Sequence, residues 1–270
     1  MSNDKSILLG AVAYDPKVVT IWEGIREHFQ DEGVPLDFAL FSNYERQVEE
    51  LLKGHLDIAW NTPLAHVHIK QRTGAESISL GMRDSDRDFH AKLIVRRGAG
   101  ITSLKDLEGK TLAVGSSDST QARILPLYFL GREGVDLSRL KILSFDTDLG
   151  KHGDTGTSEL DVLKALHEGH ADAGTIGDLI WVNEQAAGHV DSGRFEVLWT
   201  TPGFDHCMFD AHPLVSPEKI EAFKRALFAM RWDNPKHRRL LELEGLREWL
   251  PPREEGYSSL KDALKNKLAT

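Results

Sequence analysis

The sequence has a single cysteine, Cys207, among its 270 residues. An intrachain disulfide and a zinc cluster built from several cysteines are therefore both excluded. This scarcity leaves the cellular compartment open, because proteins of the bacterial periplasm often lack disulfides as well.

Long apolar runs are also missing. No stretch approaches the roughly 18–20 apolar residues that cross a bilayer, so no membrane insertion is expected. The N-terminus, MSNDKSILLGAVAYD, has one lysine and a short apolar run, which is not the pattern of a signal peptide. The sequence thus predicts a cytoplasmic protein if Met1 is the native start, and a periplasmic one if a leader has been removed.

Positive charge is in short supply. The 33 Lys and Arg residues face 42 Asp and Glu residues, which gives a formal net charge of −9. Binding to nucleic acid needs a basic face, so nucleic acid is excluded as the main partner. The chain also has no phosphate-binding loop, no dinucleotide glycine pattern and no nucleophile with a base at a recognisable spacing. We therefore expect no cofactor, no metal and no catalysis.

What is present is a regular alternation of apolar strands and amphipathic helices, which is typical of a parallel α/β unit. The first unit has strands at 7–13, 35–41 and 56–60 and helices at 16–33 and 44–54. The same order restarts after residue 98, with strands at 110–115, 140–146 and 171–176 and helices at 119–134 and 157–169. The pattern predicts two similarly wound α/β lobes.

Two extended runs, 89–97 and 194–210, are placed to connect these lobes. We expect lobe 1 to comprise residues 1–95 and 206–270, and lobe 2 residues 96–205. Residues 216–270 are predicted to be helical only, so they cannot build a third lobe by themselves and would complete lobe 1. Two crossings between α/β lobes predict a hinged cleft.

The stretch AVGSSDSTQARILPLYFL (113–130) places four hydroxyl residues between a buried strand and a buried helix. These are Ser116, Ser117, Ser119 and Thr120. One hydroxyl is enough to cap a helix. Four hydroxyls at a helix start favour a binding site for an anionic ligand in addition to a cap.

Several phrases resemble one known family. They are GHLDIAWNTPLAHV (54–67), FHAKLIVRR (89–97), SLKDLEGKTLAVGSSDSTQARILPLYFL (103–130) and VLKALHEGHADAGTIGD (162–178). Together they are similar to the phosphate, phosphonate and phosphite group of type II periplasmic solute-binding proteins, the receptors of ABC importers. The similarity covers about residues 7–210.

The resemblance implies a two-lobed type II periplasmic-binding-protein fold of the α/β class. Each lobe would be a doubly wound, mostly parallel sheet, and two crossing strands would hinge the lobes. A small anion would be held in the cleft at helix starts. The Ser119-Thr120 pair matches the family's Ser-Thr pair, and Tyr14, Asn61 and Thr62 fall at strand ends, where ligands bind in such sheets. Asn61 and Thr62 can equally cap the helix that begins at Pro63.

Two departures from the family pattern bear on the ligand. Gln121, itself a candidate ligand contact, stands where members often have Ser, and Ser158-Glu159 stands where they often have a Ser-His pair. His152 is a candidate to replace that histidine. A carboxylate facing an oxyanion repels it unless the ligand also carries a cation. A zwitterion such as an aminophosphonate therefore fits better than phosphate itself.

Other polar residues have two interpretations each. Glu159 and Asp178 can meet a ligand amine, but both also lie in the first turn of a predicted helix, where carboxylates are favourable. The run His206-Cys207-Met208 has the residue types of a copper or nucleophile site, yet its place at the second crossing favours His206 in the cleft and Cys207 in the core. Arg83 stands among aspartates and is expected in a surface ion network.

The sequence therefore predicts a solute-binding protein for a small anionic or zwitterionic ligand, working with an ABC permease. The alternative is a cytoplasmic enzyme or ligand sensor on the same fold, acting on a small carboxylate or heterocycle.

Overall fold

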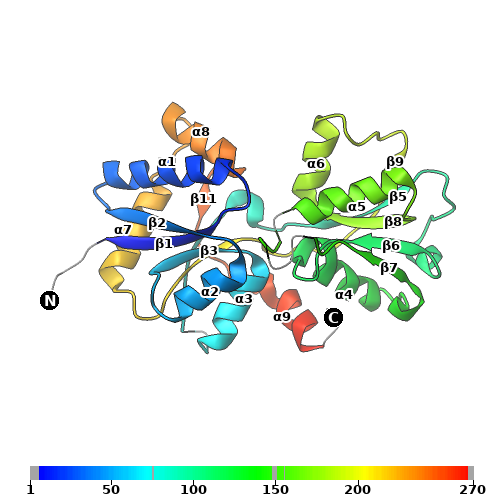
Figure 1. Cartoon of the computed structure of the whole chain (residues 1–270), viewed down its shortest axis with the longest axis horizontal. Coiled ribbons are helices and arrows are strands. Elements are labelled where there is room, and N and C mark those ends of the chain that lie inside the picture. The colour runs from blue at the N-terminus through cyan, green and yellow to red at the C-terminus, as the bar shows by residue number, and fades with distance from the viewer. Residues whose placement is uncertain (1–5, 75, 148–150, 155, 267–270) are drawn as a thin grey trace. The chain divides into compact units, whose positions relative to one another are not determined.

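A computed structural model describes residues 6–74, 76–147, 151–154 and 156–266 (Figure 1). The first five residues, part of the stretch considered for a signal peptide, lie outside that description. The chain divides into two compact units. The first unit contains the chain up to Arg87 and Asp205–Glu255, and the second contains Asp88–Phe204 and the chain from Gly256 onward.

The first unit is a six-stranded sheet with helices on both faces (Figure 1). Its strand order is β11-β4-β10-β3-β1-β2. The strands are β1 (Ile7–Val12), β2 (Leu36–Phe41), β3 (Ile58–Asn61), β4 (Ile78–Arg83), β10 (Met208–Ala211) and β11 (Trp249–Leu250). The helices are α1 (Lys17–Asp31), α2 (Tyr44–Leu52), α3 (Pro63–Arg72), α7 (Pro217–Phe228) and α8 (Pro235–Glu244).

Alternation along the strands creates a core on each face of this sheet, because successive side chains of a strand point to opposite sides. Ile7 and Leu9 of β1 pack with Phe29 of α1 and Phe223 of α7 on one face. Leu8 belongs to the opposite core, which α2 and α3 cover. Burial of these side chains stabilises the unit by about 1.5–3 kcal/mol for each large apolar residue.

The second unit is a five-stranded sheet in the order β7-β6-β8-β5-β9. Its strands are β5 (Ala91–Arg96), β6 (Thr111–Val114), β7 (Lys141–Ser144), β8 (Ala173–Gly177) and β9 (Phe195–Thr200). Its α-helices are α4 (Leu125–Arg132), α5 (Thr157–Glu168), α6 (Asp178–Ala186) and α9 (Ser258–Lys265), and a π-helical turn, η3 (Thr120–Ile124), precedes α4. Leu112 and Val114 pack beneath α4, whereas Ala113 between them faces α5.

Strand direction confirms the predicted mostly parallel winding and shows where it breaks. Strands β1, β2, β3 and β4 run in one direction and β10 runs against them. In the second sheet, β5 alone runs against β6, β7, β8 and β9. Both β5 and β10 are the first strands after the chain enters a unit, at residues 88 and 205. The entering strand of each unit is thus reversed, and in the first sheet the edge strand β11 is reversed as well, because it pairs antiparallel with β4.

The unit boundaries differ from the expected lobes in two places, at the first crossing and at the C-terminus. Residues 88–95 and the chain from Gly256 belong to the second unit rather than to the first. Tyr257 is fully buried, and α9 packs against α4 and η3. The amphipathic spacing of Leu260 and Ala263 predicts a helix with one buried face, but such spacing carries no information about which sheet the helix covers.

Among the described residues, no helix is long and apolar enough to cross a membrane.

Candidate functional site

The carboxyl ends of three parallel strands meet at one edge of the second sheet. Strand β6 pairs in parallel with β7 and with β8. The segments after Val114, Ser144 and Gly177 therefore leave the sheet at the same edge, which is where α/β proteins bind ligands. The segment after Val114 is the hydroxyl-rich stretch, and α5 begins beside it and packs on β6 and β8.

Gly115, the first residue of that stretch, allows the turn after β6 to approach η3 closely. A Cβ at this position would lie 2.6 Å from Cβ of Ala122 and 3.0 Å from Oγ of Ser158. The contact atom of Ala122 cannot rotate away, because it is itself a Cβ. Only glycine therefore fits between the turn and the starts of η3 and α5.

Replacing Gly115 with alanine is expected to destabilise the protein by about 1–3 kcal/mol, the usual cost of overpacking. Urea unfolding measures this cost. Gly131→Ala in α4 is the matched control, because a Cβ there meets nothing closer than 3.5 Å. In the control, alanine should be neutral or stabilising, since it favours the helix. Equal stability of the Gly115→Ala variant and the wild type would contradict the close approach.

A proline explains why the predicted continuous helix at 119–134 begins as a π-helical turn. Pro126 has no N–H and cannot donate to the carbonyl of Ala122, four residues earlier. That carbonyl instead accepts hydrogen bonds from Gly115 N (3.0 Å) and Thr175 Oγ1 (2.6 Å). The helix start is thereby fastened to β6 and β8, which fixes the side chains it presents.

The four hydroxyl residues of the stretch have different roles. Ser119 is the N-cap, and its Oγ accepts from Ala122 N at 3.2 Å. Ser117 is half-buried, and its backbone N–H donates to Asp146 at 2.7 Å. Ser116 and Thr120 are buried, and their hydroxyl oxygens have no hydrogen-bond partner among the described residues. One residue thus caps the helix, and two hydroxyls are available.

A third such hydroxyl belongs to Ser158 at the start of α5. It is buried, and its Oγ likewise has no partner in the described parts of the chain. Buried polar groups in native proteins are nearly always hydrogen-bonded, and each exception calls for an explanation. A bound ligand that forms hydrogen bonds with these three hydroxyls, at the adjoining starts of η3 and α5, would explain the exceptions.

Carboxyl groups stand beside these hydroxyls. The amide of Gln121 donates to Asp154 Oδ1 (3.2 Å) and to Glu159 Oε1 (3.0 Å), so Gln121 links the two carboxyls. Burial, together with the charges of Glu159 and Asp118, holds the pKa of Asp154 well above its usual range. Oδ2 of Asp154 and Oδ1 of Asp118 have no hydrogen-bond partner among the described residues. The site thus presents acceptors as well as hydroxyls.

Glu159 and Asp178, both predicted as ligand contacts, have protein partners. Glu159 Oε2 accepts from the backbone N–H of Gly177 at 2.5 Å, so this carboxylate holds the end of β8. Asp178 accepts from His90 N at 3.0 Å and pairs with Lys92 Nζ at 2.7 Å. His152, the suggested replacement for the family histidine, is half-buried in the segment before α5.

In the first unit, Asn61 and Thr62 have partners within the fold. The fully buried Asn61 amide donates to Asp210 Oδ2 at 3.0 Å and accepts from Gln47 at 2.9 Å. Thr62 is the N-cap of α3, with Oγ1 accepting from Ala65 N. The contact of Thr62 is therefore that of a helix cap, which is one of the two interpretations that the sequence left open.

Tyr14 follows β1 and is partly exposed. Burial of its hydroxyl end and the charge of Glu244 raise the pKa of Tyr14 to about 12, so the phenol stays a neutral donor at physiological pH. His206 lies just before β10, with Nδ1 3.3 Å from Asp86 Oδ1 and 3.1 Å from Cys207 Sγ. Cys207 belongs to the core cluster, as predicted.

The expected surface ion network around Arg83 is wrong. Only 13% of the Arg83 side chain is exposed, and its guanidinium makes two bonds to the fully buried Asp86, at 2.7 and 2.8 Å. It also donates to the carbonyl of Glu244 at 2.9 Å and lies over the Trp60 ring. The aspartate-rich sequence indicates an ion pair, but its burial comes from Glu244 and Trp60, which are distant in sequence.

Sequence analysis did not single out Asp118 or Asp154, and it noted Ser158 only as part of a departure from the family. Asp118 lies inside the hydroxyl run itself, so its position was a usable signal. Asp154 lies in the segment before α5, and no spacing rule connects it to Gln121, 33 residues earlier.

A mixed α/β fold of two units, with a polar site at the carboxyl edge of parallel strands, is the architecture of solute-binding proteins and also of many enzymes. A profile of the family described as "ABC transporter, phosphonate, periplasmic substrate-binding protein" matches residues 11–257. The chain belongs to this family, whose members are binding components of transporters rather than enzymes.

Individual relatives are distant. The probable ABC transporter phosphite binding protein PhnD1 of Prochlorococcus marinus is 23% identical over 230 residues, which span 82% of this chain and 74% of the relative. The structure of PhnD1 in complex with methylphosphonate has a TM-score of 0.77 at 19% identity and covers 98% of this chain and 99% of PhnD1. XAC2383 of Xanthomonas citri, bound to ATP, has a TM-score of 0.74 at 19% identity, with 98% of each chain covered. These structures share the fold but hold different ligands, so the fold alone does not specify the ligand.

Proposed function

We propose that this chain binds a small phosphonate with the hydroxyl groups of the second unit and acts as the receptor of an ABC importer. The observation that carries the proposal is the group of three buried hydroxyls, on Ser116, Thr120 and Ser158, that have no hydrogen-bond partner among the residues that the structure describes. Family membership supports the transport role over the alternative of an enzyme or sensor.

Neutral donors suit an oxyanion that is removed from water. A hydrogen bond to a charged group contributes about 1.5–3 kcal/mol, more than a neutral pair. Hydroxyls make such bonds without bringing a cation whose own desolvation would be costly. A phosphonate has several oxygens around one phosphorus, so it can accept from three hydroxyls that surround it.

The nearby carboxyl oxygens restrict the class of ligand further. Oδ1 of Asp118 needs a hydrogen-bond donor, which a fully ionised phosphonate group lacks, and the carboxyl of Asp154 becomes a second such acceptor when a neighbouring cation favours its ionised form. A ligand with an amine at its other end supplies both a donor and a compensating positive charge. We therefore propose a zwitterionic aminoalkylphosphonate as the preferred ligand class.

The proposed partner is an ABC permease, and the proposed compartment is the periplasm. Both rest on the family description, which names a periplasmic substrate-binding component of a transporter.

The Asp154→Asn variant tests recognition of the amine end of the ligand separately from recognition of its phosphonate end. The raised pKa means that ionising Asp154 in the folded protein costs stability as the pH rises above the ordinary carboxyl range. Asparagine removes this cost and keeps an acceptor for Gln121, so the ligand-free variant should be more stable than the wild type at pH 7. A gain in stability on removal of a binding group is typical of functional sites.

Thermal unfolding with a panel of ligands at fixed ionic strength measures both effects. A ligand at a hundred times its Kd stabilises the protein by about 2.7 kcal/mol. We expect the wild type to respond most to 2-aminoethylphosphonate, less to methylphosphonate and least to methanesulfonate. In Asp154→Asn, the response to 2-aminoethylphosphonate should fall to that of methylphosphonate. An undiminished preference for the amine would contradict the role of Asp154, and silence towards every phosphonate would contradict the proposed function.

A further inference from the structure

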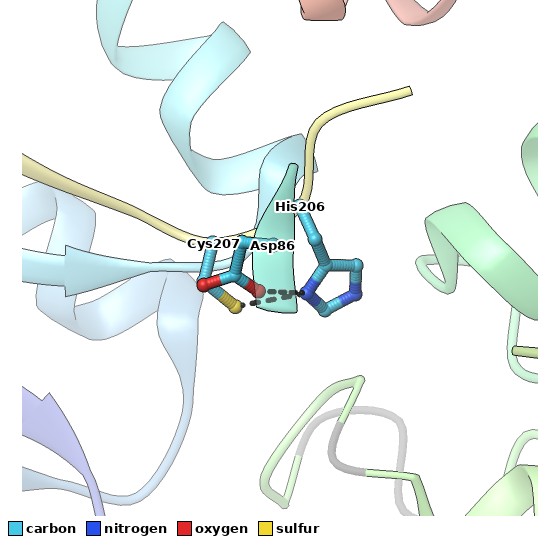
Figure 2. Close-up of side chains that lie close together, drawn as sticks. All are labelled: Asp86, His206 and Cys207. Atoms are coloured by element: carbon cyan, nitrogen blue, oxygen red, sulfur yellow. Dashed lines mark hydrogen bonds and ion pairs between the residues drawn. The ribbon is translucent and has the colours of Figure 1, made fainter. Parts of the chain in front are cut away.

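Three side chains of different ligand type converge in the first unit. Asp86 comes from the turn after β4, and His206 and Cys207 come from the segment that enters β10. Their carboxylate oxygen, imidazole nitrogen and sulfur atoms all lie within 4.8 Å of one another. Figure 2 shows the Asp86 carboxylate and the Cys207 sulfur both directed at the near nitrogen of the His206 ring.

The arrangement differs from that of a nucleophilic cysteine. In a catalytic triad, the base receives the nucleophile on one ring nitrogen and the orienting carboxylate on the other. Here Asp86 Oδ1 and Cys207 Sγ approach the same nitrogen, Nδ1 of His206, at 3.3 and 3.1 Å. The three atoms form a triangle with no side longer than 4.8 Å, which is small enough for one metal ion to contact all three.

Two sides of this triangle, the ones that meet at His206 Nδ1, are close to the separations in tetrahedral zinc sites. With bond lengths of about 2.0 Å to nitrogen, 2.1 Å to oxygen and 2.3 Å to sulfur, ligand atoms on a zinc tetrahedron are about 3.4–3.6 Å apart. The two measured separations are smaller by only a few tenths of an ångström. We propose that Asp86, His206 and Cys207 bind a divalent zinc ion, with water as the fourth ligand.

Neighbouring contacts hold the three ligands in place. The Arg83 guanidinium binds both oxygens of Asp86, at 2.7 and 2.8 Å, and turns Oδ1 towards His206. Each carboxylate oxygen has a second lone pair, so this fork leaves Oδ1 able to coordinate. The backbone N–H of His206 donates to the carbonyl of Asp86 at 2.8 Å and joins the two segments. Such outer contacts orient metal ligands in known sites.

The donor types favour zinc. Sulfur, imidazole and carboxylate together match a borderline ion such as zinc rather than magnesium or calcium, which prefer oxygen alone. On binding, the Cys207 sulfur coordinates as the thiolate, and its proton passes to solvent. His206 is 13% exposed, which gives an ion a route to the site.

Cobalt(II) titration of the purified full chain, stripped of metal with a chelator, tests this proposal. We expect one equivalent to bind, with visible bands of tetrahedral cobalt and a near-ultraviolet thiolate-to-cobalt band. Added zinc should displace the cobalt and abolish both. Cys207→Ser should remove the thiolate band, and His206→Gln should weaken binding by more than tenfold, because even outer contacts contribute about that much.

His189→Gln is the matched control, since His189 also lies beside a carboxylate, that of Glu184, but on the exposed surface. Its cobalt spectrum should equal that of the wild type. Circular dichroism of each variant without metal separates loss of a ligand from loss of the fold. The absence of a thiolate band in the wild type, or its persistence in a folded Cys207→Ser variant, would overturn the proposal.

Discussion

Replacing Asp210 with alanine is expected to lower the free energy of unfolding by about 3–5 kcal/mol, the cost of breaking a buried ion pair by removing one partner. Asp210 lies on β10, in the interior of the first sheet, and is fully buried. Its two oxygens lie 2.9 and 3.0 Å from Nδ1 of the equally buried His66. The Asn61 amide donates to it as well. Alanine would remove the acceptor of His66 Nδ1 and one of the two acceptors of the Asn61 amide.

The same pair predicts a dependence of stability on pH. Burial by itself lowers the pKa of His66, but the charge and hydrogen bond of Asp210, with a smaller effect from Glu254, raise it to about 9. A histidine whose folded pKa exceeds its unfolded value stabilises the protein fully below pH 6.5, and this contribution is lost as the pH rises through 9. The loss amounts to about 3 kcal/mol for such a shift.

Urea unfolding of wild type and Asp210→Ala at pH 6 and pH 9.5 measures both effects. The variant should be much less stable at pH 6, and the two proteins should approach each other at pH 9.5. Asp37→Ala is the control, because Asp37 lies on β2 of the same sheet with its side chain largely exposed. Its cost should stay below about 0.5 kcal/mol at either pH. A similarly small cost for Asp210→Ala would contradict the buried pair.

Replacing Thr120 with valine should weaken phosphonate binding by about 10- to 100-fold, the value of one hydrogen bond to a charged group. Valine keeps the shape of threonine and removes only the hydroxyl. Because that hydroxyl has no partner among the described residues, its loss should leave the ligand-free protein as stable as before or slightly more so.

Ser119→Ala provides the contrasting variant one residue away. Ser119 caps the helix start through Ala122 N, so its loss should cost about 1 kcal/mol of stability. Calorimetric titration with methylphosphonate and thermal unfolding without ligand distinguish the two variants. If Thr120→Val instead lost stability and kept its affinity, the hydroxyl would be part of the fold rather than of the site.

The sequence predicts the architecture well because periodicity is a local property. Every strand and helix expected between residues 7 and 176 exists within a few residues of its expected bounds. The assignment of α9 to the first lobe was wrong. Leu260 of α9 is buried in the second unit, whose last strand, β9, ends at Thr200, far earlier in the sequence. Such a contact depends on the whole chain and not on local pattern.

For the site, the sequence predicts the stretch but not the role of each hydroxyl. Ser119 and Thr120 are neighbours with similar side chains, yet only the backbone conformation at η3 makes one a cap and leaves the other available. Asp210 and Asn61 are 149 residues apart, so their contact could not be read from spacing. Asn61 was predicted as a ligand contact only because it ends a strand. The same position brings its amide next to Asp210 of β10.

The central claim is that the hydroxyls at the carboxyl edge of the second sheet bind a phosphonate. The most direct measurement is calorimetric titration of the wild-type chain and the Thr120→Val variant with methylphosphonate, under identical conditions. We predict saturable binding of one equivalent to the wild type and at least tenfold weaker binding to the variant. No heat of binding in the wild type, or equal affinity in the two proteins, would contradict the claim.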